Sequence, residues 1–330
     1  MKNILTVILL IVVTSLQAQT NTPYRKITVA LDGSGEFTSI QKAINSTRDL
    51  GPGEVAIFIK KGTYHEKVTI PTWKHQLTLV GEDKDQTIIT NNDYSGKIDS
   101  ITQKEHSTFT SYTLLVQGDD IHLKNLTIKN SSCNQGQAVA LHVEGDRFMA
   151  KNCNLLGCQD TLYTATEGSR QYYENCFIEG TTDFIFGEAT VVFQNCTINS
   201  LVNSYITAAA TPQNQEFGYV FFNAHLVAED GVDKVYLGRP WRSYAKTVFI
   251  HTTMEEHILK EGWNPWTGDK MFPEKEKTTY YAEYKSTGEG ASSETRVPWS
   301  HQLTKKEAQA YTIEAIFKGC DSWNPKNIQL

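Results

Sequence analysis

The sequence of 330 residues lacks the excess of basic residues that nucleic-acid-binding proteins usually carry. Asp and Glu number 37 against 31 Lys and Arg, and the formal net charge is −6. A glycine-rich phosphate loop of the Walker or dinucleotide-binding type is also missing. These absences argue against a nucleic-acid partner and against a nucleotide site built on such a loop.

Patterns for metal sites and serine hydrolases are missing too. The spacings of the six cysteines match no zinc motif, and no acidic cluster suggests a Ca²⁺ site. The nine histidines show no triad-like arrangement with serine, so a Ser-His-Asp esterase is unsupported. We therefore expect neither a metal nor an organic cofactor.

Long hydrophobic runs are absent except at the N terminus. There Lys2 precedes an apolar run, Ile4 to Val13, and residues 16–18 form a plausible cleavage site. A run of about ten residues is too short to span a bilayer, so a signal peptide over 1–18 is favoured over a buried N-terminal strand. We expect residues 19–330 to be exported as one soluble domain, secreted or periplasmic, without a membrane anchor.

What the sequence does contain is an internal repeat. Four segments share an Asn, a small or apolar residue, a variable residue, and then Leu or Ile: "KNLTIKN" at Asn125, "KNCNLLG" at Asn152, "ENCFIEG" at Asn175 and "QNCTINS" at Asn195. The steps between the asparagines are 27, 23 and 20 residues. A period in this range indicates a solenoid of stacked coils.

The secondary-structure pattern fits a solenoid of strands. The segments are short, rich in Val, Ile, Phe and Thr, and interrupted by Gly, Asn and Asp. Helical patterns are scarce and fall at 38–49 and 304–317. We therefore predict an all-β parallel β-helix with short helices as caps. The alternative, a β-sandwich, predicts hairpin turns and not a self-similar step.

Two aspartates occupy the same place in consecutive coils. Asp160 lies eight residues after Asn152, and Asp183 lies eight residues after Asn175. Stacked strands are about 4.8 Å apart, so the two carboxyl groups should face the same side, one coil apart.

Such a pair has the makings of a catalytic site. Two close carboxylates cannot both ionise easily, so the pKa of one should rise, which separates an acid from a nucleophile or base. Gln159 and Gln137 could donate hydrogen bonds to a developing oxyanion. Gln137 lies 23 residues before Asp160, although the phase of that longer coil is uncertain. The alternative is a structural ladder of Asn and Asp side chains along the stack.

Three cysteines share one phase of successive coils. Cys153, Cys176 and Cys196 each follow a repeat asparagine and should stack inside the solenoid. A disulfide between Cys153 and Cys176 and a ladder of reduced thiols are both compatible with this placement. The pairing of the cysteines cannot be read from their number.

At these residues the sequence resembles the pectin methylesterases (pectinesterases, carbohydrate esterase family 8), over nearly all of residues 19–330. The segments that carry the resemblance are "ALDGSGEFTSIQKAI" (30–44), "KGTYHEKVTI" (61–70), "GQAVAL" (136–141), "GCQDTLY" (157–163), "DFIFG" (183–187), "LGRPW" (237–241), "EGWNPW" (261–266) and "YAEYKSTGEGA" (281–291). It implies a single-stranded, right-handed parallel β-helix of the pectin lyase-like type. It also implies hydrolysis of the C6 methyl esters of pectin (methylated homogalacturonan), without a cofactor.

The resemblance also implies catalytic roles. Asp183 would be the nucleophile, and Asp160 the general acid that becomes a general base. Gln159 and Gln137 would form the oxyanion hole, and Arg239 would hold Asp183 ionised.

Substrate contacts are implied in the same way. Trp241 would stack on a sugar, Thr108 matches a substrate contact, and Tyr163 and Phe186 resemble aromatic residues of the cleft. We expect a monomer that acts on pectin in the cell wall. Turn capping by Arg239 and a core position for Trp241 are the alternatives, whereas Trp263 and Trp266 are assigned a structural role.

The sequence departs from the family at two places. Cys158 stands where many relatives carry an aromatic residue, and the stretch 164–171 is slightly longer than in plant members. Because the resemblance already begins at residue 24, we expect no inhibitor-like helical pro-domain before it. The competing functions are a β-helix glycosidase or lyase acting on polygalacturonate, and a sugar-binding solenoid without catalysis.

Overall fold

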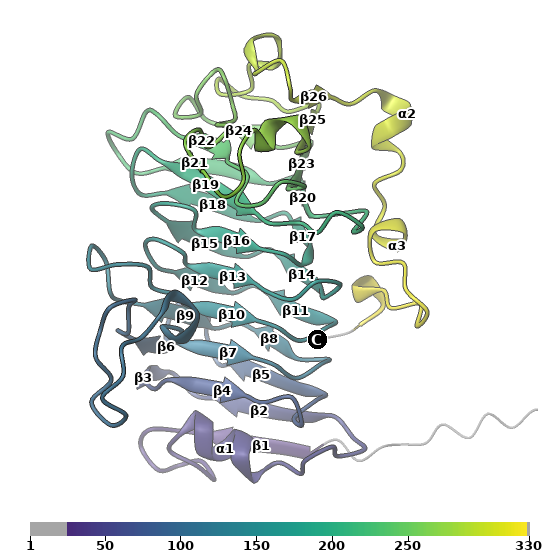
Figure 1. Cartoon of the computed structure of the whole chain (residues 1–330). Helices are drawn as coiled ribbons and strands as arrows, with labels where there is room; N and C mark the ends of the chain where they lie inside the picture. The colour runs from purple at the N-terminus through teal and green to yellow at the C-terminus, as the bar shows by residue number, and fades with distance from the viewer. Residues whose placement is uncertain (1–24, 329–330) are drawn as a thin grey trace, which may run out of the picture.

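Three parallel β-sheets run side by side along one axis in the computed structural model, which describes residues 25–328 (Figure 1). The chain passes from sheet A to sheet B and then to sheet C, and each circuit forms one coil. Neighbouring strands pair in parallel, and crossovers between parallel strands are almost always right-handed. The predicted right-handed parallel β-helix is confirmed.

The sheets contain the following strands in chain order. Sheet A consists of β1 (Arg25–Val29), β2 (Val55–Ile59), β5 (Leu77–Gly81), β8 (His122–Lys124), β11 (Phe148–Lys151), β14 (Arg170–Glu174), β17 (Thr190–Gln194), β20 (Tyr219–Phe222), β23 (Lys246–Ile250), β25 (Tyr280–Tyr284) and β26 (His301–Gln302). Sheet B consists of β3 (Gly62–His65), β6 (Thr87–Asn91), β9 (Thr127–Asn130), β12 (Asn154–Leu156), β15 (Phe177–Gly180), β18 (Thr197–Ser200), β21 (His225–Ala228) and β24 (Thr253–Met254). Sheet C consists of β4 (Val68–Ile70), β7 (Leu114–Val116), β10 (Leu141–Val143), β13 (Leu162–Thr164), β16 (Ile185–Gly187), β19 (Tyr205–Ala209) and β22 (Tyr236–Gly238).

The turn from sheet A to sheet B explains the asparagine repeat. Asn125, Asn152, Asn175 and Asn195 each follow the last residue of a sheet A strand, with φ values of 53°, 52°, 53° and 54°. Asparagine adopts this left-handed conformation more readily than most residues. The side chains also stack, since Asn152 Nδ2 donates to Asn125 Oδ1 over 2.7 Å. The repeat therefore marks one turn in each coil.

The interior of the solenoid holds stacks of like side chains. Tyr173, Phe193, Phe221 and Phe249 follow one another along sheet A with ring centroids 5.1, 4.4 and 4.4 Å apart. All four are fully buried within one continuous apolar core. Burial of rings of this size, together with their stacked geometry, stabilises each coil against the next.

The cysteines are divided between the interior and one loop. Cys153, Cys176 and Cys196 are buried free thiols in the same phase, so the ladder of reduced thiols is the alternative that the structure adopts. The disulfide joins Cys133 to Cys158 instead. It ties a loop after sheet B to the segment that leads into β13.

The N-terminal end of the stack is capped by α1 (Ile40–Ser46), as predicted (Figure 1). Ser39 begins this helix, and its hydroxyl accepts a hydrogen bond from Lys42 N over 3.3 Å. Ile40 and Ile44 turn inward and join the core of the first coil.

The second predicted helical stretch has a different place. It forms two short helices, α2 (Lys305–Ala308) and α3 (Ile313–Ile316), and lies along the outer face of sheet A (Figure 1). Ile313, Ile316 and Phe317 pack there against Tyr172 and other outward side chains. This segment covers a sheet and does not cap an end.

Four short 3₁₀ helices complete the described elements: η1 (Thr108–Thr110), η2 (Lys275–Lys277), η3 (Ser293–Thr295) and η4 (Pro325–Asn327). Within residues 25–328, no helix combines the length and the hydrophobicity that crossing a membrane requires. The predicted signal peptide, residues 1–18, lies outside the described residues.

Candidate active site

The two aspartates stand on adjacent coils, at the entrance to sheet C. Asp160 lies two residues before β13 and Asp183 two residues before β16, and the pairing of Leu162 with Ile185 brings them into register. Both backbones are left-handed, with φ of 66° and 51°. Asp160 N also donates to Thr182 O over 3.2 Å, on the neighbouring coil. The shared phase predicted for this pair is confirmed.

Arg239 binds one member of the pair. It directly follows β22, and its Nε and Nη2 atoms donate to Asp183 Oδ1 and Oδ2 over 3.0 and 2.7 Å. The guanidinium carbon lies 3.7 Å from the centre of the Trp266 ring and 4.0 Å from that of Tyr205. Two hydrogen bonds and two aromatic faces therefore fix the cation in one orientation.

The electrostatic environment separates the two carboxyl groups, which are 8% and 6% exposed for Asp160 and Asp183. Burial and the Asp183 carboxylate raise the pKa of Asp160 well above its ordinary value, against the opposing effect of Arg239. Burial also raises the pKa of Asp183, but the hydrogen bonds with Arg239 oppose that rise. The arrangement favours a proton on Asp160 and an ionised Asp183.

Gln137 and Gln159 border the pair from two neighbouring coils. Sheet C advances 21 residues between Leu141 and Leu162, so Gln137 is level with Cys158 and is not in phase with Asp160. The two segments are nevertheless held together, because Ala138 N donates to Gln159 O over 3.1 Å. The disulfide to Cys158 joins the same two segments. Both side-chain amides therefore reach one cleft from a braced backbone.

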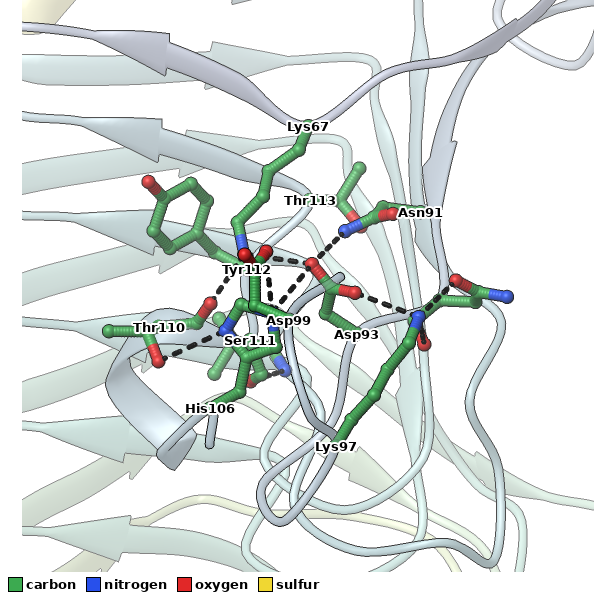
Figure 2. A network of polar contacts seen from close by, with 12 residues as sticks. Lys67, Asn91, Asp93, Lys97, Asp99, His106, Thr110, Ser111, Tyr112 and Thr113 are labelled. Carbon is green, nitrogen blue, oxygen red and sulfur yellow. Dashed lines mark hydrogen bonds and ion pairs between the residues drawn. The ribbon is translucent and has the colours of Figure 1, made fainter. Parts of the chain in front are cut away.

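Thr108 comes from η1, within the long loop between β6 and β7. Figure 2 shows the polar network that holds this loop, with Asp93 at its centre. Asp93 accepts hydrogen bonds from Lys67 Nζ, Lys97 Nζ and Asn91 Nδ2 over 2.8, 2.9 and 2.9 Å. Lys67 Nζ also donates to Thr110 O over 2.6 Å, inside η1.

These contacts leave Asp93 ionised. Burial raises the pKa of its carboxyl, but the bonds from Lys67, Lys97 and Asn91 outweigh burial and hold the pKa well below its usual range. Ionised and bonded on three sides, Asp93 fixes the base of the loop. The loop in turn presents Thr108 and Phe109 to the cleft.

Aromatic rings line the floor and rim of the cleft. Phe186 stacks on Tyr163 with centroids 4.6 Å apart and an angle of 10° between the rings, and Trp241 meets Phe186 edge-on at 5.8 Å. Tyr163 also contacts Phe109, with a centroid distance of 5.3 Å. Such a row of rings suits the flat apolar faces of a sugar polymer.

The structure gathers the sequence-predicted residues in one place. A cleft of about 250 Å³ is lined by Thr108, Phe109, Gln137, Gln159, Asp160, Asp183, Phe186, Ala208, Arg239, Trp241 and Trp266. Tyr163, the remaining predicted residue, lines the adjoining hollow. Of the two tryptophans assigned a structural role, Trp263 is buried in the core, whereas Trp266 lines the cleft. The contact between Trp266 and Arg239 joins two segments that are not related by the repeat, so the periodicity of the sequence could not reveal it.

Within the described part of the chain, no three or more His, Cys, Asp or Glu side chains lie together in a group that could hold a metal ion.

Comparison with known proteins agrees with the geometry. Residues 26–320 match the family model for Pectinesterase. Pectinesterase 2 from Citrus sinensis is 36% identical over 319 residues, covering 92% of this chain and 59% of that protein. The chain spans about half the length of other curated plant relatives.

Solved structures are similar over most of their length. The pectin methylesterase from carrot has a TM-score of 0.82 at 33% identity and covers 92% of this chain and 96% of its own. A pectin methylesterase in complex with a hexasaccharide has a TM-score of 0.77 at 30% identity, with 91% and 98% covered.

Proposed function

Because this chain belongs to the pectinesterase family, we propose that it hydrolyses the C6 methyl esters of pectin to pectate and methanol. The observation that supports this most strongly is the aspartate pair on adjacent coils, of which Asp183 is bound by Arg239. It supplies a nucleophile and an acid, the two groups that ester hydrolysis through an acyl-enzyme needs. These steps require no metal and no organic cofactor.

In the first step, a carboxylate oxygen of Asp183 attacks the carbonyl carbon of the methyl ester. The carbonyl π electrons move to the carbonyl oxygen, and the amide N–H groups of Gln137 and Gln159 donate to the oxyanion that forms. Arg239 keeps the attacking carboxylate ionised and oriented through its two hydrogen bonds.

The tetrahedral intermediate then expels methanol. The bond between the carbonyl carbon and the methoxy oxygen breaks, and Asp160 gives its proton to that oxygen, because methoxide is a poor leaving group. The products of this step are methanol, an anhydride between Asp183 and galacturonate, and an ionised Asp160.

Water completes the cycle. Asp160 takes a proton from a water molecule, whose oxygen attacks the galacturonate carbon of the anhydride. The bond to the Asp183 oxygen breaks and returns its electrons to Asp183 as a carboxylate. The pectin unit leaves as a free carboxylic acid, and Asp160 is protonated again.

Aromatic and polar side chains around this centre would hold the polymer. Trp241 offers a ring for stacking on a sugar, Phe186 and Tyr163 form the adjoining platform, and Thr108 offers a hydroxyl. A related pectin methylesterase has been solved in complex with a hexasaccharide, which supports an extended cleft of this kind.

The proposal also covers the domain organisation, the location and the oligomeric state of the enzyme. Residues 1–18 serve as a signal peptide, and residues 19–330 form one catalytic β-helix domain. The protein acts outside the cytoplasm as a secreted or periplasmic monomer, without a membrane anchor.

Product analysis on methylated pectin tests the proposal. The protein should release methanol without new reducing ends or unsaturated products. Asp183→Asn should abolish methanol release while pectin binding remains nearly unchanged, and Asp230→Asn, at an exposed aspartate outside the cleft, should leave both unchanged. Reducing ends would point to a glycosidase, unsaturated products to a lyase, and binding without any product to a sugar-binding solenoid.

A further inference from the structure

Sheet C carries a second row of side chains, which comes after the row that contains Asp160 and Asp183. His142, Tyr163, Phe186 and Ala208 are in register on adjacent strands and point outward, away from the core. Because side chains alternate along a strand, the residues two positions further on face the same side. These include Glu144 and Glu188, with Ala165 between them, so the two carboxylates stand two coils apart, about 10 Å.

These residues line a hollow that adjoins the catalytic cleft. It has a volume of about 380 Å³ and is bordered by Phe109, His142, Glu144, Tyr163, Ala165, Thr166, Glu167 and Glu188. Phe109 also lines the catalytic cleft, and Tyr163 stacks on Phe186 of that cleft. A polymer lying across the aspartate pair in this direction would pass over the hollow.

One buried side chain in the hollow is unsatisfied. His142 is 4% exposed, and within residues 25–328 its Nδ1 atom has no hydrogen-bond partner. Its Nε2 atom lies 3.3 Å from Glu144 Oε1. A buried polar atom without a partner is costly unless a ligand or water supplies one. Both ring nitrogens are covered by protein, so His142 borders the hollow and lies beside Glu144 without presenting a nitrogen to its surface.

The charge in the hollow is predominantly negative. The hydrogen bond with His142 lowers the pKa of Glu144 and outweighs burial, so Glu144 is ionised at neutral pH. Burial raises the pKa of Glu188. Glu167 is exposed at the rim. Arg242 is the cation that acts on Glu188, but its guanidinium lies against the rings of Trp241 and Phe272, 4.4 and 4.8 Å from their centres.

We propose that this hollow is a sugar subsite that accepts a methyl-esterified galacturonate unit and rejects a unit with a free carboxylate. The inference rests on the proposed function and adds to it the pattern of methylation that the enzyme prefers. Tyr163 and Phe109 provide the apolar surface for the sugar. An ionised unit would bring another negative charge close to the ionised Glu144, whereas a methyl ester brings none.

Neutral variants of the two glutamates test the proposal. For each variant, kcat/KM is measured on highly methylated and on partly de-esterified pectin, and the ratio of the two values gives the discrimination. Glu144→Gln and Glu188→Gln should each lower that ratio about three- to tenfold, as expected for one charge at a partly exposed site. Most of the change should appear as a lower KM on the de-esterified substrate.

Matched variants separate the local effect from overall charge and folding. Glu256→Gln removes the same charge at an exposed residue that lines neither the cleft nor the hollow, and should leave the ratio unchanged. Glu167→Gln acts at an exposed rim residue, so it should fold normally and lower the ratio by a smaller factor. Added salt should lower the wild-type ratio, and should lower that of Glu144→Gln by a smaller factor because one of the screened charges is already missing.

The outcomes also distinguish the two proposals. If the wild type releases no methanol from any pectin, the proposed function fails and the subsite falls with it. If the wild type releases methanol but Glu144→Gln, Glu188→Gln and Glu167→Gln keep the wild-type ratio, the esterase stands and the subsite is overturned.

Discussion

The catalytic cleft and the adjoining hollow are both lined by pairs of carboxyl groups from sheet C, but the charges around the two pairs differ. In the cleft, Arg239 binds Asp183 through two hydrogen bonds, whereas Asp160 is buried beside the Asp183 carboxylate and has a raised pKa. In the hollow, Glu144 lies beside His142 and accepts a hydrogen bond from Gln117 Nε2 over 2.9 Å, and Glu188 is partly buried. The same backbone repeat therefore presents carboxylates in two electrostatic environments.

The difference shows how one scaffold supports two tasks. A cation bound to one of two close carboxyl groups separates their protonation states, which acid and nucleophile chemistry requires. A carboxylate to which no arginine is bound keeps a negative field that acts on whatever enters. Asp183 and Glu188 stand on either side of the same strand, β16, so reaction and selection are separated by only five residues of chain.

Among variants that keep the aspartate pair, the largest effect is expected from the oxyanion donors. Gln159→Ala or Gln137→Ala should lower kcat by roughly 10²–10³-fold with little change in KM, because the lost bond forms mainly in the transition state. Steady-state kinetics on methylated pectin measure this. The discrimination set by the hollow should remain at the wild-type value. An unchanged kcat in both variants would remove the assigned role.

Arg239→Ala removes the bound cation from the cleft, so that its two carboxyl groups, like those of the hollow, have no arginine bound to them. Asp183 must be ionised to attack, and loss of the cation raises its pKa, so the acid limb of the pH profile of kcat/KM should move to higher pH. Breaking a buried ion pair costs about 3 kcal/mol. If the transition state loses that amount of stabilisation, kcat/KM falls roughly 10²-fold.

Arg239→Lys is the conservative control for this variant. It keeps the charge but loses the two-point geometry, and should shift the limb less. An acid limb that stays in place in Arg239→Ala would show that the guanidinium does not control Asp183.

A smaller effect is expected from the disulfide. Replacing Cys133 and Cys158 together by Ser should lower the free energy of unfolding by about 2–4 kcal/mol, because the unfolded chain gains freedom. It should also lower kcat by less than about tenfold, because Gln159 directly follows the bridge and loses part of its positioning. Cys320→Ser, at an exposed free thiol, is the matched control and should change neither quantity.

The smallest effect is a gain in stability from Asp160→Asn. The raised pKa of Asp160 means that the folded state holds a proton that the unfolded chain, with a carboxyl pKa near 4, releases as the pH rises. Wild-type stability therefore falls with pH between these two pKa values. An asparagine side chain cannot titrate, so the variant should gain Tm progressively above about pH 4, by about 2–4 °C per kcal/mol recovered. Thermal unfolding at several pH values would show equal Tm values if Asp160 were not buried as a neutral acid.

The β-helix and the aspartate pair could be predicted because both follow the repeat. Asn152 and Asn175 occupy left-handed turns that few other residues tolerate, so the period is visible in the sequence. The offset from Asp160 to Asp183 equals one coil. Where two residues are separated in the sequence by the length of one coil, their proximity in the structure can be predicted.

Features formed by loops could not be predicted in this way. Trp266 and Phe109 reach the cleft from long irregular segments, and the partner of Cys158 lies in a loop whose course has no period. Gln137 was expected near the phase of Asp160, which lies 23 residues later. The step between their two coils is 21 residues, so the two residues are out of phase. The row that contains Glu144 and Glu188 was hidden for a related reason, since it spans two coils of unequal length.

The division of roles between Asp183 and Asp160 is tested most directly by the leaving-group dependence of Asp160→Asn. The first turnover of galacturonate esters with methyl and with nitrophenyl leaving groups isolates acylation, in which Asp160 donates its proton. If Asp160 is that donor, the variant should lose roughly 10²–10⁴-fold on the methyl ester and far less on the aryl ester, whose leaving group needs no proton. Equal losses on the two esters would contradict the assignment of Asp160 as the acid.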